Sequence, residues 1–215
     1  MNELNQQGPG ATAPKSNAGR NILIGVIIAV VALGWIATVV VKKLFSYGVE
    51  KAVEISSGVS VDKEGGTLTF KGKDGTSVVV TGQGGDGSVS MKGADGKGEF
   101  AFNAGNNATL PADFPKDFPV IAGAKITASS RMSQGKATVF NVVWEAAKDI
   151  KQAGDYYTGE LTEKGWKFTM STDTDDASAK AIERQRGNNR QDGTLALKKK
   201  DTGSEIVLIL RIESK

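Results

Sequence analysis

The sequence predicts an α+β protein with an N-terminal single transmembrane helix, then an antiparallel β-meander and a small two-layer α+β sandwich of order β-β-α-β-β-β-β. Three observations predict this fold. Residues 21–41 carry no charge, residues 58–106 are rich in glycine with alternating apolar positions, and one helical period interrupts the strand-like runs beyond residue 120. With 39% hydrophobic and 24% charged residues among 215, the chain can bury one or two modest cores.

The N-terminal end of the chain predicts a disordered tail and a membrane span. Residues 1–20 hold few sizeable apolar groups and cannot bury enough surface to become ordered. Residues 21–41 lie between Arg20 and Lys42, and a helix of this length, at about 1.5 Å per residue, crosses a hydrocarbon core of about 30 Å. We therefore expect a transmembrane helix at 21–43 and a single-pass protein of the cell (inner or cytoplasmic) membrane, with a cleaved secretory signal as the alternative. The absence of cysteine and the size of the following segment favour a C-terminal domain outside the cytoplasm, whereas the lysines after the span favour the reverse.

A juxtamembrane helix and five short strands are predicted next. Residues 44–57 carry apolar residues between charges, which predicts a helix that Gly58 ends. From 58 to 106, apolar residues alternate with small or polar ones, and turns such as KGKDGT and GQGGDG divide the strands of a glycine-rich β-meander. The alternating apolar positions are Val59, Val61, Leu68, Phe70, Val78, Val80, Val89, Met91, Phe100 and Phe102. Because these side chains would lie on one face, we expect the helix, the following domain or another copy of the chain to cover it.

A proline-hinged linker at 107–119 separates the meander from an α+β domain at 120–215. In its segment LPADFPKDFP we expect Phe114 and Phe118 to dock on the domain, with an exposed partner-binding patch as the alternative. The domain is expected to hold one helix, at 148–164, whose apolar residues recur at helical spacing and which Gly165 ends. Strands are expected at 125–131, 137–144, 166–170, 180–186, 193–199 and 205–212.

The expected helix and the strand after it carry the motif Y-Y-x-x-x-L-x-x-x-G-W, formed by Tyr156, Tyr157, Leu161, Gly165 and Trp166. With the proline-rich segment before it, this part of the chain, residues 110–170, resembles a group of uncharacterised bacterial membrane-anchored proteins and lipoproteins. The resemblance implies a bacterial surface location and no activity, since the motif consists of packing residues. The chain departs from the lipoprotein members in lacking a lipobox cysteine, which leaves the helix as the visible anchor.

The composition excludes several kinds of chemistry. The chain has neither histidine nor cysteine, so we assign no catalytic, cofactor-binding or metal-binding residues and expect no cofactor. The GQGGDG segment at 82–87 matches G-x-G-x-x-G, but a strand-like pattern follows it, so we expect a hairpin turn and no nucleotide. Asp74, Asp86 and Asp95 recur singly, without the clustering of a calcium site. The net charge of +3 is spread along the chain, which argues against nucleic acid as a partner.

Two features of the second domain are candidate binding sites. Six cations on adjacent strands of an expected hairpin could bind an anionic envelope polymer or lipid headgroup, with a solvated outer face as the alternative. These anion-binding candidates are Arg184, Arg186, Arg190, Lys198, Lys199 and Lys200. Tyr156, beside the core-facing Tyr157, is expected to be exposed and is the candidate for a partner contact.

These observations predict a single-pass membrane-anchored envelope protein with a non-catalytic extracytoplasmic binding or assembly domain. Its expected partners are the lipid bilayer, through residues 21–41, and a protein partner or a second copy of the chain, through the face or edges of the sheet. One alternative is a scaffold subunit of a membrane complex. The other is a carboxylate-dependent envelope hydrolase, in which acids of the loop at 173–176 face another acid across a cleft. Its candidate acids are Asp173, Asp175, Asp176, Glu145 and Glu183.

Overall fold

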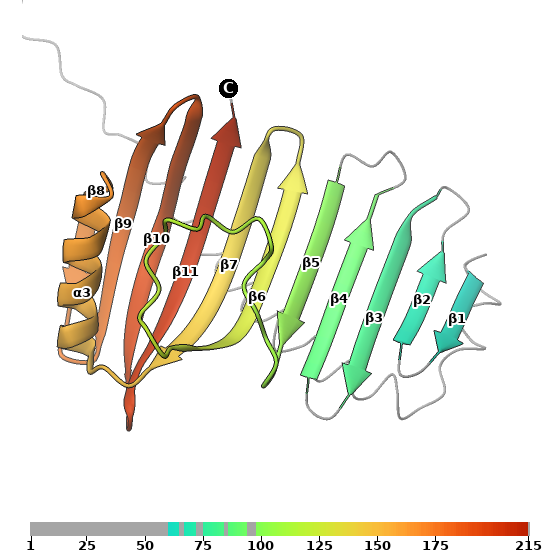
Figure 1. Ribbon diagram of the computed structural model, residues 1–215, viewed down its shortest axis with the longest axis horizontal. Coiled ribbons are helices and arrows are strands. Elements are labelled where there is room, and N and C mark those ends of the chain that lie inside the picture. The colour runs from blue at the N-terminus through green and yellow to red at the C-terminus, as the bar shows by residue number, and fades with distance from the viewer. Residues whose placement is uncertain (1–59, 65–66, 72–74, 84–85, 94–97, 215) are drawn as a thin grey trace, which may run out of the picture. The chain divides into compact units, whose positions relative to one another are not determined.

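The computed structural model describes residues 60–64, 67–71, 75–83, 86–93 and 98–214, which form strands and one helix (Figure 1). The chain divides into two compact units, Met1–Val40 and Val41–Lys215, and the described residues all belong to the second. None of the helices formed by these residues is long and apolar enough to cross a membrane. The tail, the transmembrane helix at 21–43 and the helix at 44–57 expected from the sequence lie outside the described residues.

The described elements follow the order expected from the sequence. The meander forms β1 (Ser60–Glu64), β2 (Thr67–Lys71), β3 (Ser77–Gln83), β4 (Asp86–Lys92) and β5 (Gly98–Ala104). The second domain forms β6 (Lys125–Gln134), β7 (Ala137–Ala146), α3 (Ile150–Glu163), β8 (Lys167–Asp173), β9 (Ala177–Arg186), β10 (Asn189–Lys200) and β11 (Gly203–Ser214). The element order β-β-α-β-β-β-β in the second domain is therefore confirmed.

All these strands belong to one 11-stranded antiparallel sheet, in the order β1-β2-β3-β4-β5-β6-β7-β11-β10-β9-β8. The expected fold, a meander followed by a separate two-layer sandwich, is therefore wrong. The meander continues the sheet of the second domain, because β5 pairs with β6 along its whole length. After β7 the chain passes through α3 to the far edge at β8, and β11 then returns to pair with β7.

One face of the sheet is covered by α3 and by the segment that joins β5 to β6, both of which lie on the viewer's side in Figure 1. Beneath them lies the hydrophobic core. The strands contribute Phe140, Val142, Trp144, Ile182, Leu195, Leu197, Ile206, Leu208 and Leu210 to it. The helix contributes Ala153, Tyr157 and Leu161, which recur every fourth residue and so form one stripe.

Local interactions fix both ends of α3 and its distance from the sheet. The Asp149 carboxylate caps the N-terminus by accepting a hydrogen bond of 2.8 Å from the Gln152 N–H. Gly165 ends the helix with a φ of 78°, a left-handed conformation that glycine adopts without strain. In the core, Trp144 Nε1 donates a hydrogen bond of 2.8 Å to the Tyr157 hydroxyl. Burial raises the pKa of Tyr157, so this hydroxyl stays protonated.

The proline-rich segment is held to the core by its two aromatic rings. Phe114 and Phe118 are 5% and 4% exposed, respectively. The Phe114 ring centroid lies 5.6 Å from that of Phe140, and the Phe118 centroid lies 5.8 Å from that of Trp166, both in edge-to-face geometry. Docking on the domain is therefore confirmed, and the alternative of an exposed aromatic patch is wrong.

Candidate interaction surface

The face of the sheet opposite α3 carries the apolar side chains of the meander. Directly paired residues of antiparallel strands point to the same face, and neighbours along a strand point to opposite faces. One paired row runs from β3 to β7 through Val78, Met91, Phe100, Met132 and Val139, and a second runs from β3 to β5 through Val80, Val89 and Phe102. Because Phe140 points into the core under α3, its neighbour Val139 and both rows lie on the other side. We call that side the open face.

The C-terminal half of the open face, formed by β6, β7, β9, β10 and β11, has an apolar centre between two charged ends. Its two central paired rows are Ala128, Val143, Val207, Ala196 and Ala179, and Ser130, Asn141, Ile209, Thr194 and Ala181. The row at one end is Lys125, Glu145, Glu205 and Lys198, and the row near the other end includes Arg211, Asp192 and Glu183. The meander half consists of Val78, Val80, Val89, Met91, Phe100 and Phe102.

The large hydrophobic side chains that are exposed in the described part of the chain all lie on the open face. Met91 is 44% exposed, Met132 49% and Met170 52%, and Met170 is paired with Ala181 of the central rows. Both α3 and the segment between β5 and β6 pack on the opposite face, so the described residues leave these methionines uncovered. Methionine adapts its shape to a partner, and an exposed apolar surface of this kind marks an interaction site.

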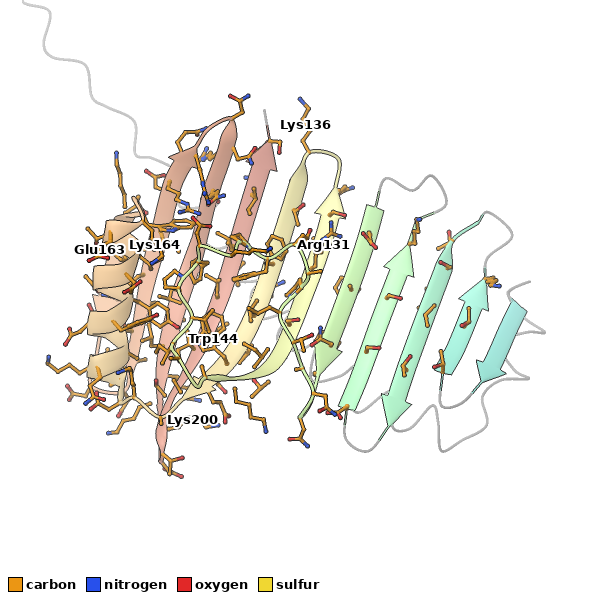
Figure 2. All side chains as sticks on the ribbon, in the orientation of Figure 1. Arg131, Lys136, Trp144, Glu163, Lys164 and Lys200 are labelled. Atoms are coloured by element: carbon orange, nitrogen blue, oxygen red, sulfur yellow. The ribbon has the colours of Figure 1, made fainter. Side chains whose placement is uncertain are left out.

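The basic residues expected to share one surface lie on two faces and at two ends of the sheet. Arg184 and Arg186 point to the α3 side of β9, where Arg184 Nη1 donates to the Lys164 carbonyl at 3.2 Å. Lys198 and Lys200 point to the open face, and Lys198 pairs with Ala177, about 23 Å along β9 from Arg184. Figure 2 shows Lys164 and Lys200 toward opposite ends of the strands. The placement expected for these residues is therefore corrected, and anion binding stays an untested prediction.

Four carboxylates contact five of these six cations. Arg184 and Arg186 both contact the Asp117 carboxylate, at 2.7 and 2.6 Å. The other pairs are Arg190 with Asp192 at 3.5 Å, Lys199 with Asp176 at 3.1 Å, and Lys200 with Glu145. These pairs leave little net positive charge to attract a polyanion.

Arg184 is the most buried of these cations, and its contacts hold several elements of the fold together. Its side chain is 4% exposed, and its guanidinium carbon lies 4.4 Å from the Trp166 ring centroid. Its Nε donates to Gln191 Oε1 at 2.6 Å. Burial by itself raises the pKa of Asp117, but the hydrogen bond and charge of Arg184, with the charge of Arg186, hold that pKa below its ordinary value. Arg184 and the residues it contacts, Asp117, Trp166 and Gln191, form what we call the Arg184 cluster. This cluster joins the proline-rich segment to β9 and to the end of α3.

Tyr156, the residue expected to be exposed, is half-buried. Its ring centroid lies 5.2 Å from that of Tyr157, and its hydroxyl donates to the Val120 carbonyl at 3.3 Å. Tyr156 thus helps to hold the segment before β6, and its role in a partner contact stays a prediction.

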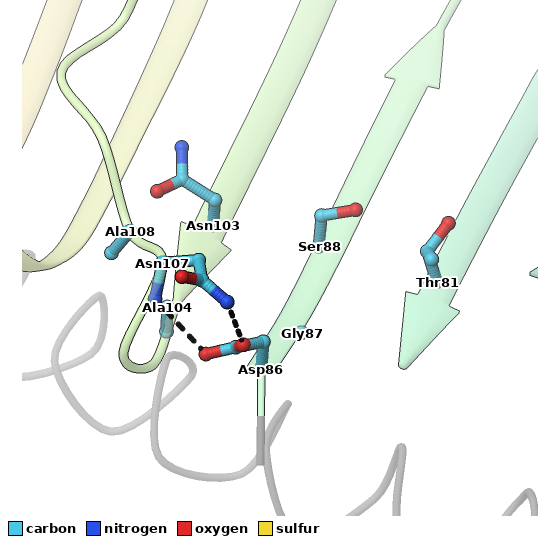
Figure 3. A pocket seen from close by; sticks show the side chains of 8 residues that line it. All are labelled: Thr81, Asp86, Gly87, Ser88, Asn103, Ala104, Asn107 and Ala108. Atoms are coloured by element: carbon cyan, nitrogen blue, oxygen red, sulfur yellow. Dashed lines mark hydrogen bonds between the residues drawn. The ribbon is translucent and has the colours of Figure 1, made fainter. Parts of the chain in front are cut away.

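A polar hollow of about 460 Å³ lies on the covered side of the meander, beside the turn after β5 (Figure 3). Thr81, Ser88 and Asn103 line it, and Asp86 closes one side. The Asp86 carboxylate accepts hydrogen bonds from the backbone N–H and the Nδ2 of Asn107, at 3.2 and 2.6 Å. The backbone hydrogen bond is the main reason that the pKa of Asp86 is lowered. Asp86 therefore secures the turn, and β3 and β4 pair as the hairpin expected for the GQGGDG segment.

The acids of the hydrolase alternative do not converge in the described structure. Asp173 accepts a hydrogen bond of 2.9 Å from Ser171 and lies 3.6 Å from Lys180. Lys199 and Lys200 are neighbours in β10 and so point to opposite faces, which places their partners Asp176 and Glu145 on opposite sides of the sheet. Among the residues that the structure describes, no three His, Cys, Asp or Glu side chains are grouped to hold a metal ion.

Sequence reasoning identified the apolar face of the meander but missed its continuation over the second domain. The available signal was the second set of apolar residues in β7 and β11, including Val143, Val207 and Ile209. Within the described residues only the side facing α3 is covered, so the same signal indicates a surface open to a partner.

Comparison of the chain with protein-family models, with curated proteins and with solved structures found no match. The resemblance to bacterial membrane-anchored proteins stays a prediction. The function is therefore inferred from the geometry of the open face.

Proposed function

We propose that the protein is a non-catalytic assembly module anchored in a membrane, in which two copies of the chain pair through the C-terminal half of the open face. The anchor is supported by the uncharged stretch at 21–41. The observation that carries the pairing is the apolar centre of this half, which is bounded by charged rows and edged by the exposed Met132 and Met170. An apolar centre inside a polar rim is the usual anatomy of a protein interface.

The size of this half fits a stable interface. Strands β6, β7 and β9 have 10 residues each, and β10 and β11 have 12. Five strands spaced about 4.8 Å apart, with ten residues at about 3.3 Å each, cover about 800 Å². This area equals the roughly 800 Å² that each partner buries in an interface of standard size.

The charges at the ends favour a second copy of the chain over a partner of one charge sign. One end row has a lysine at each end and two glutamates between them, and the other combines Arg211 with Asp192 and Glu183. A two-fold interface brings the same patch together from both sides. Because each end of the rim carries charges of both signs, two copies of this surface can pair without net electrostatic repulsion. A partner that is uniformly acidic or uniformly basic would gain no net attraction from the same rim.

The absence of cysteine from the chain allows a direct test of the pairing. A single Val207→Cys substitution, at the centre of the C-terminal half, is introduced into the full chain in detergent micelles and oxidised. The matched control is Gln152→Cys, which is exposed on α3 on the other side of the sheet. We expect a disulfide-linked dimer with Val207→Cys and little with Gln152→Cys, together with a dimer of the parent chain in sedimentation.

A second variant tests whether the apolar centre drives pairing. Val207→Asp places one buried charge in each partner, so we expect the dimer to dissociate at least about tenfold more readily. A monomeric parent chain, or equal crosslinking of the two cysteine variants, contradicts the pairing. Crosslinking of Val207→Cys to a different protein in native membranes also contradicts it.

The anchor is tested separately by extraction of native membranes. We expect the full chain to resist carbonate and to require detergent, because an apolar stretch of this length inserts stably. A variant with Ile28→Lys and Val31→Lys should be released, since charges near the bilayer centre oppose insertion. Release of the parent chain by carbonate contradicts the anchor but leaves the pairing test unaffected.

A further inference from the structure

The meander half of the open face has a candidate occupant within the chain itself. We propose that residues 44–55 form a helix that packs on this half, over Val80, Val89 and Phe102. This inference does not depend on the pairing of two copies, because it concerns the other half of the open face. It rests on the sequence pattern of the segment, on the length of chain before β1 and on the burial of Val80.

The pattern of residues 44–55 matches that of the helix covering the other face of the sheet. Phe45, Val49 and Val53 recur every fourth residue, as the fully buried stripe of α3 does. At 100° per residue, Ala52 falls on the same side as this stripe, while Glu50, Lys51 and Glu54 lie 100° or more from its centre. Leu44 and Ile55, at the two ends of the segment, also lie away from the stripe. A helix with this pattern needs an apolar surface to cover.

The length of chain before β1 allows such a helix to reach the meander half. A helix over 44–55 is about 18 Å long, and the four strands β2–β5 are together about 19 Å wide. Residues 56–59 join it to Ser60 and span up to about 13 Å when extended. That distance is enough to step from the plane of the sheet to a helix layer about 10 Å above it.

The burial of the meander half is uneven. Val80 is 8% exposed, whereas Met91 on the same face is 44% exposed. Val80 does not belong to the core cluster beneath α3, and both α3 and the segment between β5 and β6 pack on the opposite face of the sheet. A cover supplied by this segment accounts for the burial of Val80.

Pairs of cysteines in the full chain, held in detergent micelles, test the contact. Val53→Cys is combined with Val80→Cys, because the tether to β1 places the C-terminal end of the helix nearer β3, and the matched control combines Val53→Cys with Val79→Cys, the neighbouring valine on the other face of β3. A second pair, Val49→Cys with Val89→Cys, has as its control Val49→Cys with Ser88→Cys, since Ser88 lines the polar hollow on the side of the sheet that carries α3. Each variant is treated with a short bis-maleimide, and crosslinks within one chain are separated from those between chains by gel mobility.

We expect crosslinks within one chain for the Val80 and Val89 pairs, at least about fivefold more than for their controls. Maleimide labelling of a single Val80→Cys should also accelerate about tenfold or more when Val49 and Val53 are changed to aspartate, because the covering stripe is then lost. Crosslinks between chains only, equal yields on the two faces, or an unchanged labelling rate would each overturn the proposal. The Val207 crosslink of the pairing test is read independently of all these results.

Discussion

Substitutions in the Arg184 cluster should have unequal effects on stability, because the Arg184 guanidinium is buried whereas the Asp117 carboxylate is partly exposed. The Arg184 side chain is 4% exposed, whereas that of Asp117 is 30% exposed and also contacts Arg186. Asp117→Ala leaves a buried guanidinium with no carboxylate beside it. Arg184→Met removes the buried charge, keeps an apolar stem over Trp166 and leaves Asp117 paired with Arg186.

The magnitudes follow from this asymmetry. Removing one partner of a buried ion pair costs about 3–5 kcal/mol, and we expect the lower end for Asp117→Ala because Asp117 is partly exposed. Arg184→Met leaves the Gln191 side-chain oxygen without its donor and should cost about 1–2 kcal/mol. In the double variant no uncompensated charge remains. Adding Arg184→Met to Asp117→Ala should therefore recover at least about 1 kcal/mol.

The assay is urea unfolding of the full chain in detergent micelles, followed by the fluorescence of the buried Trp144 and Trp166. The pKa of Asp117 is lowered in the folded state, so its stabilising contribution is complete above the ordinary aspartate pKa of about 3.9 and declines as the pH falls through the lowered value. The difference between the parent and Asp117→Ala should thus be full at pH 7 and shrink below about pH 4. A double variant less stable than Asp117→Ala, or a difference that is the same at pH 7 and pH 3, would refute this reasoning.

Two matched pairs of variants test the packing by the same unfolding assay. Tyr157→Phe should cost about 1–3 kcal/mol, because it leaves the buried indole N–H of Trp144 without an acceptor, whereas Tyr156→Phe, at a half-buried hydroxyl, should cost less than about 1 kcal/mol; equal effects would contradict the role given to the buried hydrogen bond. Gly193→Ala should destabilise by about 2 kcal/mol or more, since its Cβ would lie 2.2 Å from a carbonyl oxygen of β11, whereas Gly154→Ala, with nothing within 4 Å, should stabilise α3 by about 0.5–1 kcal/mol. A Gly193→Ala variant as stable as the parent would show that β10 and β11 are less closely packed than the structure shows.

The sequence predicted the strands and the helix well because their signals are local. Alternation of apolar residues, the glycine after the helix and the helical stripe each act over a few neighbouring residues. The docking of Phe114 and Phe118 was predictable for a related reason, because an extended segment with regularly spaced aromatics needs a surface to anchor it.

The arrangement of the strands was not predictable from local signals. The pairing of β5 with β6 crosses the connecting segment 105–124, and β11 pairs with β7 across the helix and three other strands. No turn of a few residues encodes either contact. The prediction that the basic residues share one surface was wrong for the same reason. Two residues in one hairpin can lie at opposite ends of the strands or on opposite faces of the sheet, and local signals do not distinguish these positions.

The position of β6 shows why a sheet of this kind needs cover on both faces. On the α3 side, β6 presents Arg131, which pairs with Asp113 at 2.6 Å and Glu99 at 2.8 Å, and on the open side it presents Met132. The buried core therefore lies under α3 from β7 onward, whereas the large apolar side chains of the meander lie on the opposite face, from β3 to β5. A single helix layer cannot cover both regions, because the two face opposite directions in one continuous sheet. Any second cover must approach the meander from the open side, which is the side that residues 44–55 are proposed to occupy.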